Sequence, residues 1–239
     1  MKLVKKSLLA LATAAAMATP AFAALNNVGG VIWEPDAGND FAGVNSTIRQ
    51  FVSGTGVVSG YGYVQTLNST LPTAFCPGCE LTISFSGFTP SGGPVIAFPF
   101  AFQNYTGGTV NFWVDSTPDT AGGTSAVAGN YSDGVLWAQF TGGFTGILNF
   151  LNSSAQGSGL LNVVGGLAQT ALDTNTRNGG TDLVFSTDFT NVPNFPVVNN
   201  ILGGGTFTGD SIHVPEPGSL ALLGLGLIGL AAARRRKAA

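Results

Sequence analysis

The chain has 239 residues, of which only 9% are charged, and its 35 glycines and single histidine distinguish it from an ordinary soluble enzyme. The four lysines lie close to the two ends of the chain. The body between the two ends contains all of the acidic residues except Glu216. Its only basic residues are Arg49 and Arg177, so the body is strongly acidic. A protein that binds nucleic acid needs a basic face to neutralise phosphates, so this composition excludes DNA and RNA as partners.

The first residues have the pattern of a secretory signal peptide. Three lysines precede an apolar stretch at residues 8–17, and an A-x-A cleavage pattern ends at Ala23. We therefore expect a signal peptidase to remove residues 1–23, so that the mature chain begins at Ala24.

The other end of the chain joins three parts in a defined order: a Pro-Glu-Pro sequence, an apolar run and a basic cluster. A helix over residues 218–233 would be about 24 Å long at ~1.5 Å per residue, slightly less than the ~30 Å hydrocarbon core of a bilayer. Basic residues prefer the cytoplasmic side, so the pattern predicts a transmembrane helix in the inner membrane with the body outside. The residues that carry this prediction are Pro215, Glu216, Pro217, Arg234, Arg235, Arg236 and Lys237.

This order and spacing resemble the PEP-CTERM sorting signal of Gram-negative bacteria, over residues 214–239 only. The resemblance implies that an exosortase, a membrane cysteine protease similar to a transpeptidase, recognises the signal and processes the chain near the Pro-Glu-Pro sequence. It also implies a place on the cell surface or in the matrix of bacteria that make exopolysaccharide, often in biofilms or flocs. From the residues alone, a permanent membrane anchor is the alternative.

Between the two ends, short apolar runs alternate with Gly, Pro, Asn and Ser, which is the pattern of an all-β domain. In the clearest strand, Glu80–Phe88, apolar and hydroxyl side chains alternate, so that one face is apolar. We predict an antiparallel, jelly-roll-like sandwich of two sheets over residues 24–210, followed by the sorting segment at 211–239. The other strands that we expect are 57–66, 94–102, 109–115, 135–140, 146–151, 182–187 and 206–213.

Two connecting segments give more specific expectations. Residues 141–145 contain two glycines between two apolar runs, which predicts a hairpin loop. Residues 160–172 have apolar side chains at helical spacing, which predicts a helix there, although Gly165 and Gly166 cost about 1 kcal/mol each in a helix.

Cys76 and Cys79 enclose a Pro-Gly pair and are the only cysteines. A redox-active pair requires the first cysteine at a helix N-terminus, whereas here the second cysteine leads directly into an expected strand. Zinc requires four ligands, and the body has neither further cysteines nor spare histidines. In an exported protein the pattern predicts a small structural disulfide.

The inventory of residues argues against an enzyme. The single histidine, His213, lies beside the sorting motif, so a serine or cysteine nucleophile would have no histidine base. A pair of carboxylates that hydrolyses glycosides is the alternative, but none of the acidic residues lies in a motif. We expect no catalytic residue and no cofactor, with calcium as the one exception.

Calcium is suggested by Glu34, Asp36 and Asp40, which lie close together in a Gly- and Asn-containing segment. Calcium takes such oxygen ligands together with backbone carbonyls, although the spacing is not that of an EF-hand loop. A solvated acidic turn is the alternative. Asp115 and Asp119 form a second, weaker candidate.

Flat aromatic faces for sugar rings could come from Trp33, Trp113 and Trp137, which would otherwise pack in the core. We therefore expect a non-enzymatic protein of the cell surface or extracellular matrix that is associated with exopolysaccharide. The alternatives are a carbohydrate-binding module, with or without calcium, and a secreted enzyme that acts on glycosides.

Overall fold

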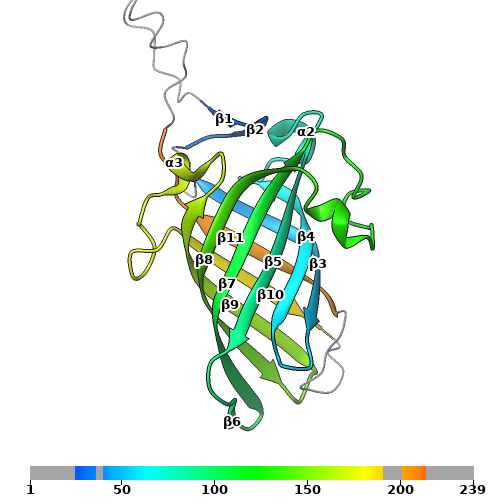
Figure 1. The fold of residues 1–239 in the computed structure, drawn as a ribbon, viewed down its shortest axis with the longest axis vertical. Helices are drawn as coiled ribbons and strands as arrows, with labels where there is room; N and C mark the ends of the chain where they lie inside the picture. Colours follow the sequence, from blue (N-terminus) through cyan, green and yellow to red (C-terminus); the bar gives the residue numbers. More distant parts are fainter. Residues whose placement is uncertain (1–24, 36–39, 191–200, 214–239) are drawn as a thin grey trace, which may run out of the picture.

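The computed structural model describes residues 25–35, 40–190 and 201–213 of the chain. This part consists mainly of antiparallel strands with a few single helical turns (Figure 1). In chain order the elements are β1 (Asn26–Val28), β2 (Val31–Trp33), β3 (Phe41–Val52), β4 (Val58–Leu67), α2 (Pro72–Phe75), β5 (Glu80–Pro90), β6 (Val95–Ala97), β7 (Phe100–Asp115), the 3-10 turn η1 (Ala128–Tyr131), β8 (Val135–Asn149), β9 (Ser154–Gly165), α3 (Gln169–Leu172), β10 (Leu183–Phe189) and β11 (Ile201–Gly209).

The main sheet closes on itself into a barrel. Its order is β5-β4-β3-β11-β10-β9-β8-β7, and β5 also pairs with β7. The last strand, β11, pairs with the first barrel strand, β3, from Gly209 opposite Phe41 to Ile201 opposite Gln50. Because successive strands are antiparallel neighbours all the way round, the fold is an up-and-down barrel, with β6 added as a hairpin on β7.

The all-β prediction is confirmed, but the structure does not show the two-sheet sandwich that we expected. From β3 to β11 the strands follow one another around a single sheet, and the only other described sheet is the β1–β2 hairpin. The pairing of β3 with β11 removes the free edges that a sandwich would keep.

The barrel interior combines phenyl rings with glycines. A Cβ atom on Gly43 would lie 2.1 Å from Cζ of Phe207, which is its partner across the β3–β11 pairing. A Cβ atom on Gly60 would lie 2.3 Å from Cζ of Phe85, again directly opposite. An eight-stranded barrel is only just wide enough for its side chains, so a large ring needs a neighbour without a side chain.

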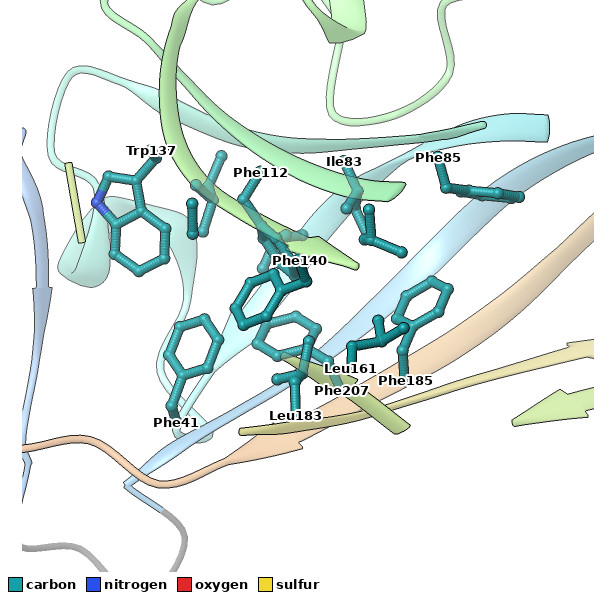
Figure 2. Close-up of a cluster of buried hydrophobic side chains, with 14 of the residues drawn as sticks. Phe41, Ile83, Phe85, Phe112, Trp137, Phe140, Leu161, Leu183, Phe185 and Phe207 are labelled. Atoms are coloured by element: carbon teal, nitrogen blue, oxygen red, sulfur yellow. The ribbon is translucent and has the colours of Figure 1, made fainter. Parts of the chain in front are cut away.

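Aromatic side chains fill the part of the barrel shown in Figure 2. The ring centroid of Phe207 lies 5.0 Å from those of Phe41 and Phe112, and the Phe112 centroid lies 5.7 Å from that of Phe140. Each of these four rings is at most 1% exposed. Edge-to-face and tilted packing of this kind stabilises the core beyond simple burial.

Strand β8 is continuous where we expected two strands and a hairpin loop at residues 141–145. Gly142 lies within β8. A Cβ atom at this position would lie 2.3 Å from the carbonyl oxygen of Leu160 in β9, so only a glycine fits. The glycine serves the close approach of two strands, and the prediction of a turn was wrong. The strand expected at 94–102 is interrupted: β6 covers residues 95–97, and β7 begins at Phe100 and continues through the strand expected at 109–115.

The helix expected over residues 160–172 is also wrong. Most of its first half belongs to β9, in which Leu161 is fully buried and Leu160 is 41% exposed, as strand alternation requires. Gly166 has a φ of +95°, and a Cβ atom on it would lie 2.6 Å from Cα of Ala138. The chain therefore turns at this glycine, and only the single turn α3 follows.

The β1–β2 hairpin, α2 and α3 close one end of the barrel (Figure 1). The indole N–H of Trp33 donates to Oγ of Ser211 at 2.9 Å, and the indole N–H of Trp137 donates to the carbonyl oxygen of Val28 at 2.8 Å. The two ring centroids are 5.5 Å apart. Both indoles therefore fasten the closed end to the barrel.

The described domain begins and ends at this closed end. The side-chain amide of Asn26 donates to the carbonyl oxygen of Ile212 at 2.9 Å, and the Ile212 N–H donates to the carbonyl oxygen of Ala171 at 2.8 Å. Nδ1 of His213 lies 3.4 Å from Oδ1 of Asn26. The packed chain thus continues past Asp210, where we had placed the end of the domain.

The packing of rings on glycines can be tested at Gly108, where a Cβ atom would lie 2.3 Å from the ring of Phe88. We expect Gly108→Ala to lower the free energy of unfolding by about 1–3 kcal/mol, because the ring must leave its position. Adding Phe88→Leu should restore part of the loss, so that the double variant is more stable than the two single changes predict together. Urea unfolding measures all three.

Gly93→Ala is the matched control for this series. Gly93 is exposed, and a Cβ atom on it would meet no atom within 4 Å, so the change should stay within about 0.5 kcal/mol. Strictly additive effects of Gly108→Ala and Phe88→Leu would contradict the proposed contact.

Candidate functional site

Several residues that we singled out lie outside the described residues. They are Ala23 and Ala24 at the expected signal cleavage site, Asp36, and the sorting residues Pro215, Glu216, Pro217, Arg234, Arg235, Arg236 and Lys237. The transmembrane helix expected at 218–233 also lies there. Within the described ranges, no helix has both the length and the apolar character needed to cross a membrane.

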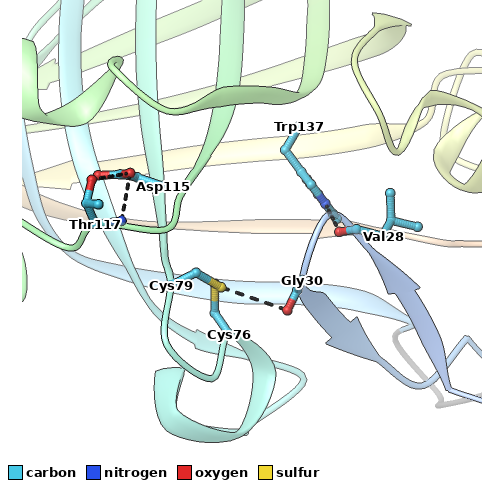
Figure 3. Close-up of a disulfide and its surroundings, with 7 residues drawn as sticks. All are labelled: Val28, Gly30, Cys76, Cys79, Asp115, Thr117 and Trp137. Atoms are coloured by element: carbon cyan, nitrogen blue, oxygen red, sulfur yellow. Dashed lines mark hydrogen bonds between the residues drawn. A yellow bond between two sulfur atoms is a disulfide. The ribbon is translucent and has the colours of Figure 1, made fainter.

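Cys76 and Cys79 form a disulfide, as predicted (Figure 3). The pair follows the single turn α2, and Gly78 between the cysteines has a φ of +79°, which a glycine adopts without strain. Sγ of Cys79 lies 3.8 Å from the carbonyl oxygen of Gly30, so the bridge contacts the turn of the β1–β2 hairpin. The disulfide therefore joins α2 to the start of β5 and borders the closed end of the barrel.

Replacing both cysteines with serine should lower the melting temperature slightly without preventing folding. The closed loop is very short, and its removal should cost about 2 kcal/mol. A thermal melt of the Cys76→Ser, Cys79→Ser variant measures the loss. Reduction of insulin by the unmodified protein would instead show that the pair is redox-active.

The three tryptophans lie in different environments. Trp33 and Trp137 are only 3% and 0% exposed, so their rings cannot stack on a sugar. The proposal of a sugar-binding role for these two was wrong, because both seal the closed end. Trp113 is half-buried on the outer face of β7, where its indole N–H donates to Oγ of Ser84 at 2.8 Å, and it remains the candidate for stacking.

Of the first calcium candidate, the structure describes Glu34 and Asp40. The side-chain amide of Asn68 donates to the carbonyl oxygen of Asp40 at 2.8 Å and lies 3.4 Å from the carbonyl oxygen of Glu34. Oδ2 of Asp40 accepts from the N–H of Ser211 at 3.5 Å. Asn68 thus brings the two ends of this acidic segment together beside the closed end.

The barrel brings together a second acidic group, Glu80, Asp115 and Asp119, with one oxygen of each within 4.8 Å of the others. Glu80 and Asp115 are partners in the β5–β7 pairing. Asp119 follows in the loop after β7. The sequence indicated the two aspartates, but Glu80 was missed because its proximity depends on the strand register.

Hydrogen bonds fix the buried member of this group. Glu80 is 2% exposed, and its Oε1 accepts from the N–H groups of Asp119 at 3.1 Å and Thr120 at 3.3 Å. Its Oε2 accepts from the Thr120 hydroxyl. Oδ1 of Asp115 accepts from the N–H and hydroxyl of Thr117 at 2.9 Å and 2.8 Å.

The electrostatics of this cluster favour a positive partner. Desolvation, and then the neighbouring carboxylates of Asp133 and Asp115, raise the pKa of Asp119, while a hydrogen bond from the Asn130 side chain opposes the shift. A calcium ion takes carboxylate and carbonyl oxygens of this kind and would offset the repulsion. The cluster therefore combines one buried, hydrogen-bonded carboxylate with the more accessible carboxylates of Asp115 and Asp119.

The loop that carries Asp119 is anchored by Tyr131 on the outer wall of the barrel. The Tyr131 ring lies 4.6 Å from that of Tyr61, its hydroxyl donates to the carbonyl oxygen of Ser125 at 3.0 Å, and its own carbonyl oxygen accepts from the hydroxyl of Thr82 at 3.1 Å. Desolvation, with a smaller effect of Tyr61, raises the pKa of Tyr131 from 10.0 to about 12. The loop is thus held by a buried phenol that must remain protonated.

The raised pKa of Tyr131 predicts a loss of stability in alkali. The stability that the protonated phenol of Tyr131 contributes to the folded state is fully present below pH 10, the pKa of the phenol in the unfolded chain. This stability is lost as the pH rises through the folded-state pKa of about 12. Tyr131→Phe should be less stable at neutral pH, since the hydrogen bond to Ser125 is lost, but its stability should decline less steeply above about pH 10. Urea midpoints from about pH 8 to 11.5 measure the two slopes, and equal slopes would contradict the assignment.

The described domain is a small barrel whose closed end leads directly into the C-terminal segment. Residues 213–237 match the family model described as the PEP-CTERM protein-sorting motif, which confirms the resemblance seen in the sequence. The motif implies an exported protein that is targeted to an exosortase and sorted at a membrane. No curated protein and no solved structure matches the chain.

Proposed function

We propose that this protein is a non-enzymatic component of the cell surface or extracellular matrix that works among exopolysaccharides. The sorting motif supports export and an encounter with an exosortase. The proposed place in the matrix is supported by the way the ends of the domain and its outer wall are arranged.

The observation that carries the proposal is the position of the domain's ends. Asn26 and Ile212 are hydrogen-bonded to each other at the closed end, and the sorting motif begins at residue 213. Any attachment through the C-terminal segment therefore holds the barrel by its closed end. The outer wall and the opposite end are left to face the surroundings.

The outer wall has the chemistry expected of a partner for sugar hydroxyls. Outward positions on neighbouring strands carry amide and hydroxyl side chains that bond across the strands. Gln139 donates to Asn111 at 3.0 Å, and Thr145 donates to Asn104 at 2.9 Å. These side-chain pairs are uncharged and can exchange their hydrogen bonds for bonds to a neutral polymer.

A second candidate function is calcium-dependent binding of an acidic polysaccharide. It is favoured by the convergence of Glu80, Asp115 and Asp119, which an ion could share with polymer carboxylates. The lysine-free acidic body would otherwise repel such a polymer, with a screening length of about 8 Å at physiological ionic strength. Trp113 lies on β7, the strand that also carries Asp115, and its indole would stack on a sugar ring of the bound polymer.

Sorting can be tested on protein recovered from the producing bacterium. Its intact mass should correspond to a chain that lacks residues 1–23 and is cut near Pro215-Glu216-Pro217. Replacing Pro215 and Pro217 with alanine should leave the C-terminal tail in place, whereas Pro94→Ala in the barrel should not affect processing. A mass that retains Arg234–Lys237 in the unaltered protein would exclude processing and favour a permanent anchor.

Binding to alginate and to dextran separates the two candidate functions. In the calcium-dependent case, alginate binding should require millimolar calcium and fall at least fivefold when Asp115→Asn and Asp119→Asn are combined. Asp188→Asn, at an exposed carboxylate elsewhere on the barrel, is the control. A loss with Asp36→Ala and Asp40→Ala would place the site on the first acidic segment. Alginate binding that survives chelation would contradict the calcium bridge.

A further inference from the structure

The end of the barrel opposite the closed end contains a cavity of about 350 Å³. Its wall is formed by inward side chains near the ends of the strands, among them Val58, Ala101, Leu148 and Phe189. These four are at most 9% exposed, so the wall is apolar and well packed. An eight-stranded barrel is wide enough to hold one small ligand, and the mouths of barrels are common ligand sites.

A small number of polar groups reach this apolar space. Gln103 is 9% exposed and donates from Nε2 to the carbonyl oxygens of Asn104 at 2.8 Å and Gly92 at 3.3 Å, which fixes its amide at the wall. Tyr105 lies beside Phe144, with 6.5 Å between ring centroids, and Thr187 is 5% exposed. Gln50 and Gln156 also line the cavity. Two hydroxyls and three amides in a mainly apolar wall can orient a ligand that has one polar group.

The cavity carries no charge. None of the described residues that line it is acidic or basic. An ionised group buried here would lose its hydration without gaining a partner of opposite charge. The ligand must therefore be uncharged in the part that enters.

The rim next to the cavity exposes apolar side chains. Val95 and Ile96 in β6, Phe98 and Leu151 are between 66% and 77% exposed. The rim is continuous with the cavity, because Val95 pairs with Phe102, which lines it. The N–H of Phe150 donates to the carbonyl oxygen of Pro99 at 2.9 Å and joins the β8–β9 turn to this hairpin.

We propose that the cavity opposite the closed end of the barrel binds the hydrocarbon chain of a neutral lipid, such as an aliphatic alcohol, ester or amide. The chain occupies the apolar cavity of about 350 Å³. The polar group of the lipid bonds to the hydroxyl of Tyr105 or Thr187. The exposed rim contacts the lipid assembly from which the chain is taken.

This site is separate from the surfaces used in the proposed function. The acidic clusters and Trp113 lie on the outside of the barrel or beside its closed end, whereas the cavity opens at the other end. Attachment through the sorting segment would leave the cavity facing away from the attached end. The lipid proposal can therefore fail while the polysaccharide proposal holds, and the reverse.

Binding is measured with diphenylhexatriene, an uncharged hydrocarbon whose fluorescence rises in apolar surroundings. The protein is used in the form recovered from the producing cells, and all variants are compared in that form so that any contribution of residues 220–233 is constant. We expect dodecan-1-ol to displace the probe at a concentration at least tenfold lower than dodecanoate or dodecyltrimethylammonium. Equal displacement by neutral and charged chains would overturn the proposal.

Variants of the wall locate the site. Ala155→Phe fills the cavity and should weaken probe binding at least fivefold, and Ala101→Leu, a smaller change on β7, should weaken it about threefold. Leu160→Phe adds a ring to the same strand as Ala155, but on its outer face, and should have no effect. Loss of binding in Leu160→Phe, or none in the two filling variants, would place the probe elsewhere and overturn the proposal.

Two further variants test the polar group and the rim. Tyr105→Phe should weaken dodecan-1-ol about fivefold and leave diphenylhexatriene unchanged, since only the alcohol uses the hydroxyl. Phe98→Ser with Leu151→Ser should slow transfer of the probe from phosphatidylcholine vesicles while changing the affinity for free probe less than twofold. If transfer is unchanged, the ligand is taken from solution, and the role of the rim is wrong.

Discussion

The contact of a phenyl ring with the bare backbone of a facing glycine is the constraint on which the rest of the barrel depends. Eight strands enclose a space in which two opposed large side chains do not fit, and Gly43 beneath Phe207 or Gly60 beneath Phe85 resolves the conflict. These contacts determine register as well as volume, because a shift by one residue would place the ring against a side chain. Part of the abundance of glycine and phenylalanine in this chain therefore has the same physical cause.

The same constraint explains which parts of the fold the sequence could predict. Strand β5 was predictable from its own alternation, and the Cys76–Cys79 bridge needed only local spacing. The closure of the barrel was not, because the pairing of β3 with β11 joins segments far apart in the chain and leaves no local signal. Glycines such as Gly142 were read as turns, since the sequence does not show that a strand approaches them closely.

The candidate sites show a similar division. The sorting motif is a linear signal and could be identified from the order of its parts. The acidic cluster could be found only in part, because Glu80 meets Asp115 through strand pairing. The burial of Trp33 and Trp137, and the cavity at the opposite end, follow from the way the described elements β1, β2, α2 and α3 all cover the same end of the barrel. Side-chain type alone does not distinguish a stacking surface from a plug.

The position of β11 determines how the domain would carry a mechanical load. This strand leads to the C-terminal segment, and it is paired on both sides, with β3 and with β10. Tension between a polymer on the barrel wall and an attachment beyond His213 would pull β11 along its own axis. Both rows of backbone hydrogen bonds would then be sheared together, whereas a strand at a free edge would be peeled away one bond at a time. Closure of the sheet would thus make the domain resistant to a force applied through its C-terminal segment.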